Sequence, residues 1–188
     1  MVEVFVKNMV CNRCIKVIKN ELLEAGVAVT KVELGRVVYK SKNIACDSKK
    51  LEKVLDENGF ELLEGDDKIL IEKVKLSLIR FLENLPLQKS GTLSSYLSKE
   101  TETDYSRLSR IFSYTEKITV EKYFIKLKIE KVKELIQSKQ YNFTQISQLL
   151  DYSNVNHLSK QFKAETGMSL TKYKTLNQNF RNSLDQIL

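Results

Sequence analysis

The chain has 188 residues, 42% of them hydrophobic and 29% charged, and its 31 Lys and Arg outnumber its 24 Asp and Glu. This composition supports a packed core and excludes a disordered chain. Because it has no long apolar run and no signal sequence, we expect a cytoplasmic protein with no membrane partner. A single His and three Cys exclude most hydrolase sites and a disulfide framework, so we expect no enzymatic activity.

The positive charge is confined to the second part of the chain. Residues 1–66 contain 11 basic and 11 acidic side chains, so the remaining 20 basic and 13 acidic side chains lie in residues 67–188. A neutral first part and a basic second part indicate two modules. Only the second module would attract phosphate groups.

Residues 1–66 alternate strand and helix signals. Alternating apolar residues predict a strand from Val2 to Val6, and helical spacing predicts a helix from Ile15 to Leu23. Two β-branched runs around Gly35 predict a hairpin. A second helical stripe ends before Gly59, and the segment Phe60–Leu63 completes the module as a strand. The order β-α-β-β-α-β predicts a ferredoxin-like domain.

Two cysteines, Cys11 and Cys14, stand where the first strand gives way to the first helix. Thiolates at this spacing can chelate one soft metal ion such as Cu(I), whereas Zn(II) would need two further ligands. The alternatives are a redox dithiol and a degenerate domain kept for packing or dimerisation. The redox alternative is weakened because the single proline, Pro86, lies outside this module. We interpret Cys46 as a half-buried structural thiol.

Residues 1–66 resemble the heavy-metal-associated domain of copper chaperones and metal-transporting ATPases. The resemblance rests on a Met-x-Cys-x-x-Cys loop formed by Met9, Cys11 and Cys14, and on the pair Gly59-Phe60. It implies that Cys11 and Cys14 are metal ligands. It also implies that Met9 is buried beneath their loop and that Phe60 packs near it. The family commonly has Gly and Thr where this sequence has Asn8 and Val10.

Residues 67–91 are predicted to form a connecting helix and a linker. A helical stripe runs from Lys68 to about Leu85. We expect the helix to stop before Pro86, because proline disfavours helical geometry in the residue that precedes it. The stretch Gln88–Thr92 has the composition of a linker.

An internal repeat organises residues 92–188, which we expect to be all-α. At an offset of 50 residues, Leu108–Phe112 matches Leu158–Phe162, and Ile118–Tyr123 matches Met168–Tyr173. Each copy predicts a short helix, a tight turn and a second helix, which together form a helix-turn-helix unit. The expected N-caps of the second helices are Thr103 and Ser153.

The second helix of each unit is expected to lie in the major groove of double-stranded DNA. Leu108 and Phe112, like Leu158 and Phe162, mark the side that packs inward. The residues that face away are Ser106, Arg107, Arg110, Asn156, His157 and Lys160. Arg and Lys suit guanine edges and Asn suits adenine, whereas a lone His is also a common surface or capping residue.

One long helix from Thr119 to about Ser138 is predicted between the two copies. Its length of roughly 30 Å is close to the spacing of about 34 Å between successive major grooves on one face of DNA. A rigid spacer of this length would hold the two reading helices in adjacent grooves. The lysines expected to neutralise phosphates nearby are Lys126, Lys128, Lys131 and Lys133.

Residues 92–174 resemble the DNA-binding domain of AraC/XylS-type transcription regulators. The second copy carries the resemblance through Ile146–Ser153, His157–Lys163, Thr166–Ser169 and Tyr173. It implies sequence-specific promoter binding by both units, with the six outward-facing residues as base-contacting candidates. Where the family usually has Gly in the second turn, this sequence has Asp151, which tolerates a left-handed backbone. Glu102 stands near the turn of the first unit.

These observations predict a transcription regulator whose N-terminal module senses a soft metal ion, with no cofactor required for DNA binding. A soluble metal carrier with a basic docking part, and a regulator whose N-terminal module no longer binds metal, are the alternatives. A homodimer is compatible with the sequence, although two reading units in one chain already suffice for two groove segments.

Overall fold

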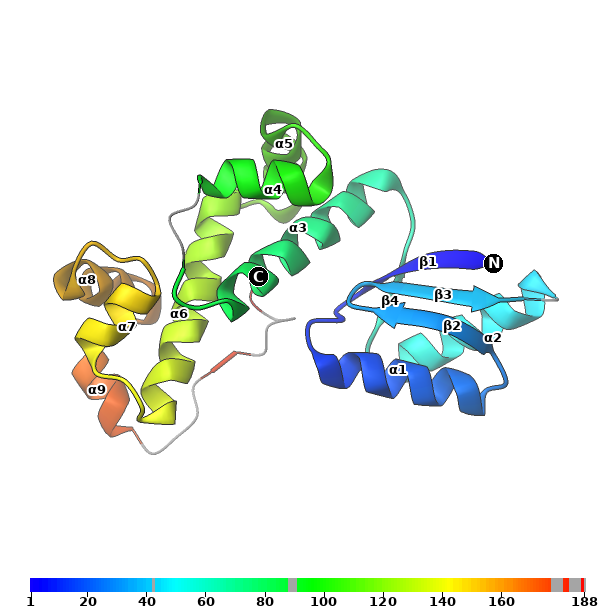
Figure 1. Cartoon of the computed structure of the whole chain (residues 1–188), viewed down its shortest axis with the longest axis horizontal. Helices are drawn as coiled ribbons and strands as arrows, with labels where there is room; N and C mark the ends of the chain where they lie inside the picture. Colours follow the sequence, from blue (N-terminus) through cyan, green and yellow to red (C-terminus); the bar gives the residue numbers. More distant parts are fainter. Residues whose placement is uncertain (42, 88–90, 177–180, 183–186, 188) are drawn as a thin grey trace. The chain divides into compact units, whose positions relative to one another are not determined.

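The computed structural model describes residues 1–41, 43–87, 91–176, 181–182 and 187. The chain divides into two compact units, residues 1–76 and residues 77–188 (Figure 1). The division falls inside helix α3 (Asp66–Glu83), which contributes residues to both units. None of the described helices is both long and apolar enough to cross a membrane.

The first unit contains, among its described residues, a four-stranded antiparallel sheet in the order β2-β3-β1-β4 (Figure 1). Its strands are β1 (Val2–Lys7), β2 (Ala28–Glu33), β3 (Arg36–Lys40) and β4 (Glu61–Leu63), and its helices are α1 (Asn12–Glu24) and α2 (Ile44–Glu57). The central strand β1 pairs on both sides, with Val4 opposite Val37 and Val6 opposite Leu62. The elements follow each other in the predicted order.

Helices α1 and α2 pack on a common core with the sheet. Ile18 and Leu22 of α1 and Leu51 and Leu55 of α2 are fully buried in this core, as is Tyr39 of β3. Because every fourth residue or so of each helix is apolar, one stripe of each faces the strands.

Two glycines mark turns of the first unit. Gly59 follows the α2 C-cap with a φ of 75°, and Gly35 turns the β2–β3 hairpin with the same φ. Gly35 also faces Leu76 of α3 so closely that a Cβ there would clash with the leucine side chain. Both glycines therefore have a backbone reason to be present.

The second unit reproduces the predicted repeat. Its helices after α3 are α4 (Leu93–Thr101), α5 (Tyr105–Glu116), α6 (Val120–Ser138), α7 (Phe143–Leu149), α8 (Val155–Thr166) and α9 (Leu170–Thr175). The starts of α4, α5 and α6 are each 50 residues before those of α7, α8 and α9. Phe112 packs on Tyr123 and Phe162 on Tyr173, each pair with ring centroids 5.5 Å apart. The sequence repeat is thus a structural repeat.

The N-caps of α5 and α8 are Asp104 and Asn154, so the predicted caps Thr103 and Ser153 are wrong by one residue. The Asp104 side chain accepts the Ser106 N–H, and the Asn154 side chain accepts the His157 N–H. The Thr103 hydroxyl instead donates to a backbone carbonyl of the preceding turn. Short acidic and amide side chains compete well for the free N–H groups of a first helical turn.

The predicted connector is described in part. Helix α3 ends at Glu83, before Pro86 as expected. Residues 88–90 of the predicted linker lie outside the described residues. Beyond α9, Arg181 forms an ion pair with Glu134 of α6.

Candidate nucleic-acid interface and thiol pair

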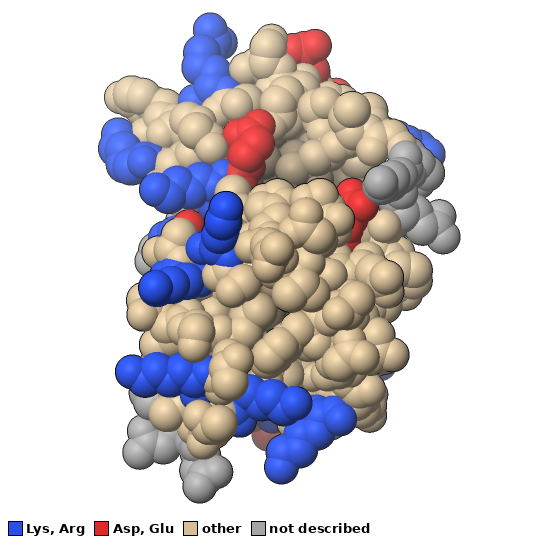
Figure 2. Space-filling view, turned by 90° about the vertical axis from the view of Figure 1, so that its left-hand side faces the viewer, with Lys and Arg blue, Asp and Glu red and all other residues tan. Residues whose placement is uncertain are grey.

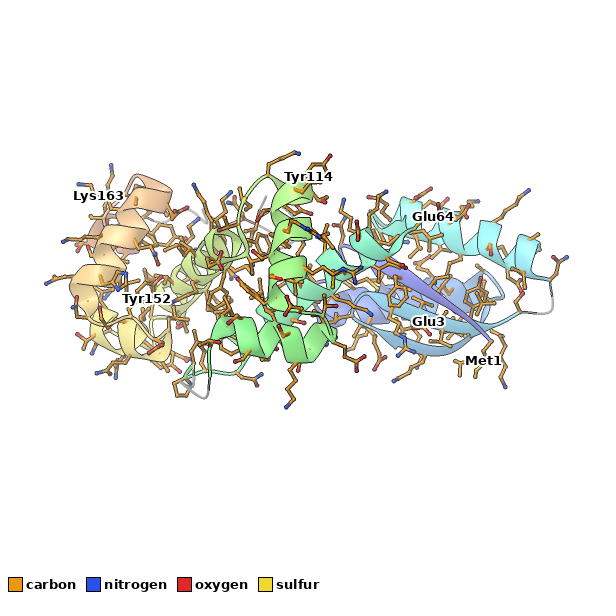
Figure 3. All side chains as sticks on the ribbon, turned by 90° about the horizontal axis from the view of Figure 1, so that it is seen from above. Met1, Glu3, Glu64, Tyr114, Tyr152 and Lys163 are labelled. Atoms are coloured by element: carbon orange, nitrogen blue, oxygen red, sulfur yellow. The ribbon has the colours of Figure 1, made fainter. Side chains whose placement is uncertain are left out.

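Helices α5 and α8 are amphipathic in the same register. Leu108 and Phe112 of α5, and Leu158 and Phe162 of α8, are at most 1% exposed. These four side chains hold α5 and α8 against the rest of the second unit. The opposite side of each helix is exposed to solvent. Figure 3 labels Tyr114 and Lys163, near the C-terminal ends of α5 and α8, and shows both at the same edge of the second unit.

The structure places all six predicted base-contacting residues on these solvent-exposed sides. They are Ser106, Arg107 and Arg110 on α5, and Asn156, His157 and Lys160 on α8. Within the described part of the chain, Arg107, Arg110 and Lys160 form no ion pair. Their positive charges are therefore available to an external ligand.

Basic side chains gather on the face that Figure 2 shows, which includes the side of α7, α8 and α9. Exposed basic residues of α8 and α9 are Lys160, Lys163, Lys172 and Lys174. Acidic side chains are sparse between them on this face. A surface of this kind attracts a polyanion.

Residues 97–176 match the family model described as "Helix-turn-helix domain". This segment is therefore similar to a helix-turn-helix domain, the name kept for residues 97–176 from here on. The match spans most of both repeat copies, and it supports the prediction of a DNA-binding transcription regulator. Among solved structures, the chain is similar to the C-terminal domain of AraT, a response regulator from Geobacillus stearothermophilus, with 19% sequence identity, a TM-score of 0.48 and coverage of 60% of this chain and 91% of that chain. Comparison with curated proteins found no match.

Within the helix-turn-helix domain, two of the six candidates are held by local contacts. The Ser106 hydroxyl donates to the Asp104 carboxylate, so it takes part in the helix cap. His157 Nδ1 lies 3.2 Å from the Ser153 hydroxyl, and the His157 ring stands edge-on to Tyr152. These contacts fix the orientation of the imidazole.

Both turns of the helix-turn-helix domain contain a left-handed residue that is not glycine. Glu102 has a φ of 51° and Asp151 a φ of 53°. Both lie between a short helix and a reading helix, the place where a sharp reversal is needed. Such a conformation costs an L-residue about 1 kcal/mol, and less for Asp than for Glu.

The spacer between the two copies of the repeat is helix α6, which begins at Val120 after its N-cap Thr119 and confirms the predicted helix from Thr119 to about Ser138. Its 19 residues span about 28 Å. Figure 1 shows α4 and α5 at one end of α6, and α7, α8 and α9 towards the other end. Tyr123 at the start of α6 receives Phe112 of α5, and α6 also contacts α7 and α8.

Three of the four lysines that the sequence predicted to neutralise phosphates, Lys128, Lys131 and Lys133, have partners within the chain. Lys133 is buried beside Glu130, with Nζ 2.6 Å from the carboxylate, and Lys131 pairs with Glu134 at 2.7 Å. Lys128 Nζ lies 3.8 Å from the centroid of the Tyr152 ring. The two ion pairs lie within α6, whereas Lys128 connects α6 to the segment that follows α7.

Two contacts that connect α5 and α8 to neighbouring segments were not predicted from the sequence. Tyr105 of α5 donates to Glu121 of α6, and burial followed by this hydrogen bond raises the pKa of Tyr105 to about 12. Tyr152 donates to Gln161 of α8 at 2.7 Å, and the same ring lies against Lys128, so it joins α8 to α6. Both tyrosines resemble ordinary amphipathic positions in the sequence, so no local signal identifies these partners.

The thiol pair lies at the start of α1, whose N-cap is Cys11. Cys11 Sγ and Cys14 Sγ are 3.5 Å apart, and both side chains are partly buried. Burial acts to raise the pKa of Cys11, but hydrogen bonds from Cys14 outweigh it, so this pKa is lowered. Burial raises the pKa of Cys14. Cys11 is therefore the first of the two to lose its proton, and the Cys14 thiol can then donate to the Cys11 thiolate.

The donor set suits a soft ion with few ligands. With metal–sulfur bonds of about 2.3 Å, sulfurs 3.5 Å apart would subtend an angle of about 100° at the ion, and a linear arrangement would need about 4.6 Å. In the described part of the chain, no cluster of three or more His, Cys, Asp or Glu side chains is placed to hold an ion. The pair itself supplies two of the four ligands that Zn(II) commonly takes.

The loop before the thiols is anchored from two sides. Asn8 adopts a left-handed φ of 71°, its side chain donates to the Gly59 carbonyl, and its N–H donates to Glu72 of α3 at 3.2 Å. Met9 is fully buried in the same core as Phe60, as the resemblance implied. Asn tolerates the left-handed region better than most residues, so this loop conformation does not require glycine at position 8. Cys46 is exposed, so its interpretation as a half-buried thiol is wrong; it lies on the first turn of α2 and points away from the core.

Proposed function

We propose that this chain is a sequence-specific transcription regulator of the AraC/XylS type, which reads DNA with α5 and α8. The observation that carries this proposal is the pair of matched helices that bury equivalent Leu and Phe residues and expose the six candidates. A solvated amphipathic helix would not need a structural duplicate at a fixed offset.

Each helix would read base edges in one major groove. Arg107 and Arg110 suit guanine, whose N7 and O6 accept two hydrogen bonds from a guanidinium. On α8, Asn156 suits adenine, and Lys160 suits guanine. Helix α6 would set the distance between the two sites, and DNA binding itself would require no cofactor.

We further propose that the N-terminal module is ferredoxin-like and binds a soft metal ion through Cys11 and Cys14. The lowered pKa of Cys11 supports this role, because thiolates are the binding form. A bound Cu(I) would replace the Cys14 proton, and binding would alter the loop that Asn8 ties to Glu72 of α3. Regulation then requires that the two DNA-binding states differ in metal affinity.

Selection of bound duplexes from a random pool, with and without Cu(I), tests the regulator. We expect one enriched sequence, and Arg110→Ala or Lys160→Ala should weaken its binding by about 1–3 kcal/mol. Lys19→Ala removes the same charge from an exposed position of α1 and serves as the control. Equal binding of all duplexes would instead indicate a metal carrier with a basic docking part.

Metal binding is tested separately by competition with a Cu(I) chelator. Cys11→Ser and Cys14→Ser should each abolish tight binding, whereas Cys46→Ser should leave it unchanged. Tight binding that persists in the Cys11→Ser, Cys14→Ser double variant would contradict the assignment of the site.

A further inference from the structure

Tyr114 is a large side chain in an unexpected place. It is 77% exposed although it lies on α5, whose other aromatic residue in this turn, Phe112, is fully buried. At 3.6 residues per turn, Arg107, Arg110 and Tyr114 share one side of the helix, because they are separated by three and four residues. Tyr114 therefore continues the outward-facing row of predicted base-contacting residues.

Lys117 accompanies this tyrosine. It is the C-cap of α5, with a left-handed φ of 60°, and its Nζ lies 4.6 Å from the centroid of the Tyr114 ring. Among the described residues no carboxylate forms an ion pair with Lys117. The Tyr114 hydroxyl and the Lys117 ammonium group therefore both lie at the exposed C-terminal end of α5. Among the described residues no carboxylate neutralises the ammonium charge.

We propose that Tyr114 and Lys117 bind one phosphate of the DNA backbone at the edge of the groove that α5 reads. This proposal rests on the proposed DNA-binding function. The N-terminal positions of a reading helix reach base edges, and Tyr114 lies about 10 Å further along the axis than Arg107. Phosphate oxygens accept hydrogen bonds from Tyr and Lys, and these contacts set the position of the protein on the duplex.

The second copy lacks this pair. Ala164 and Gly167 of α8 stand at the positions equivalent to Tyr114 and Lys117. The phosphate contact therefore belongs only to the first copy of the repeat, which contains α4 and α5. It would anchor that copy independently of the base sequence.

The test uses the full-length protein and the duplex enriched by selection. Tyr114→Phe removes the hydroxyl and keeps the ring, and Lys117→Gln removes the charge. Each should weaken binding about three- to tenfold on the enriched duplex and on random duplex alike, and Lys117→Gln should reduce the salt slope by about one. Lys139→Gln is a matched control, because Lys139 is the C-cap of α6 with a φ of 58°.

Single methylphosphonate substitutions in the duplex locate the contact. At one phosphate beside the DNA segment that α5 reads, this substitution should weaken binding of the wild-type protein. It should have no effect on binding of Lys117→Gln, because that variant has already lost the interaction with this phosphate. This loss of additivity should be absent at every phosphate for Lys139→Gln.

Two results would overturn the proposal and leave the proposed function intact. The first is unchanged affinity and salt slope in Tyr114→Phe and Lys117→Gln while Arg110→Ala still weakens the enriched duplex. The second is a loss of preference at one base pair in Tyr114→Phe, which would show a base contact. If no duplex is enriched and Arg110→Ala has no effect, both the proposed function and the phosphate contact are rejected.

Discussion

Asp104 and Asn154 are the N-caps of helices α5 and α8, and each side chain accepts a hydrogen bond from a backbone N–H group of the first turn. These N–H groups have no partner within the helix, so the cap removes the free-energy cost of leaving them unbonded. A single residue thus fixes where each reading helix starts and which of its side chains point outward.

Replacing a cap should be costlier than replacing its neighbour. We expect Asn154→Ala to lower the free energy of unfolding by about 1 kcal/mol. Ser153→Ala should lower it less, because among the described residues the Ser153 hydroxyl contacts the His157 ring and no backbone N–H of the first turn. Urea denaturation measures both. A larger loss for Ser153→Ala would show that the serine caps α8 in solution.

Lys128 is a second residue whose environment is unusual. Burial lowers its pKa to about 8, an effect that Asp151 partly offsets. The unfolded chain has an ordinary lysine pKa of about 10.4. Between these values the folded state holds fewer protons than the unfolded state, so stability should rise with pH from about 8 to about 10.

Lys128→Met should remove this pH dependence. The variant is expected to be more stable than the wild type at pH 7, where the buried charge is present, and the difference should shrink as the pH approaches 10. Lys126→Met is the control, because Lys126 lies on the same helix and, among the described residues, no aromatic ring lies against it. The free energy of unfolding is measured by urea denaturation at several pH values. The prediction is contradicted if this free energy changes with pH in the same way for the wild type and for Lys128→Met.

At the scale of elements, each unit of the repeat is closed by one aromatic pair. Phe112 of α5 meets Tyr123 of α6, and Phe162 of α8 meets Tyr173 of α9. In both copies a reading helix is thereby packed against the helix that follows it. The ring centroids are 5.5 Å apart in both pairs, so we infer that α5 and α8 are supported to a similar degree, although the rings of the second pair stand more nearly edge-on.

Removing either phenylalanine should therefore have a similar cost. Phe112→Ala and Phe162→Ala should each lower the free energy of unfolding by about 3–5 kcal/mol, as expected for a buried aromatic ring. Tyr114→Ala should cost little, because that ring is mostly exposed. If one phenylalanine proved dispensable when unfolding is followed by calorimetry, the equivalence of the two units would be wrong.

At the scale of the whole molecule, a charge-neutral N-terminal part is joined to a basic helix-turn-helix domain. Within that domain α6 is a single helix of about 28 Å. If α5 and α8 each bind DNA as proposed, a rigid spacer permits only one distance and one angular offset between the two DNA segments. This predicts a strict dependence on the spacing of the half-sites.

Inserting about five base pairs between the half-sites should place them on opposite faces of the duplex and reduce affinity close to that for random DNA. Inserting a single base pair should cost less, because DNA can be twisted slightly. Gel-shift titration of the enriched duplex and its insertion variants measures this. Equal affinity for every spacing would show that α5 and α8 do not bind one duplex together.

Local patterns in the sequence predicted most of the elements. The β-α-β-β-α-β order, the Gly35 and Gly59 turns and the 50-residue repeat all follow from spacing and from backbone preferences that act within a few residues. The same patterns predicted that α5 and α8 expose the six candidate residues, because the side of a helix is set by its period of 3.6. Whether these residues contact bases, and whether Cys11 and Cys14 bind metal, stay predictions.

Tertiary structure alone decided how the charged and polar side chains are used. Lys128 belongs to the group of lysines that the sequence predicted to neutralise phosphates, yet its Nζ lies 3.8 Å from the centroid of the Tyr152 ring, which follows α7. No local pattern singled out Tyr114, whose ring is exposed to solvent and lies beside Lys117 Nζ. The physical reason is that burial and pairing depend on groups brought together by folding, whereas helical periodicity is a property of the chain itself.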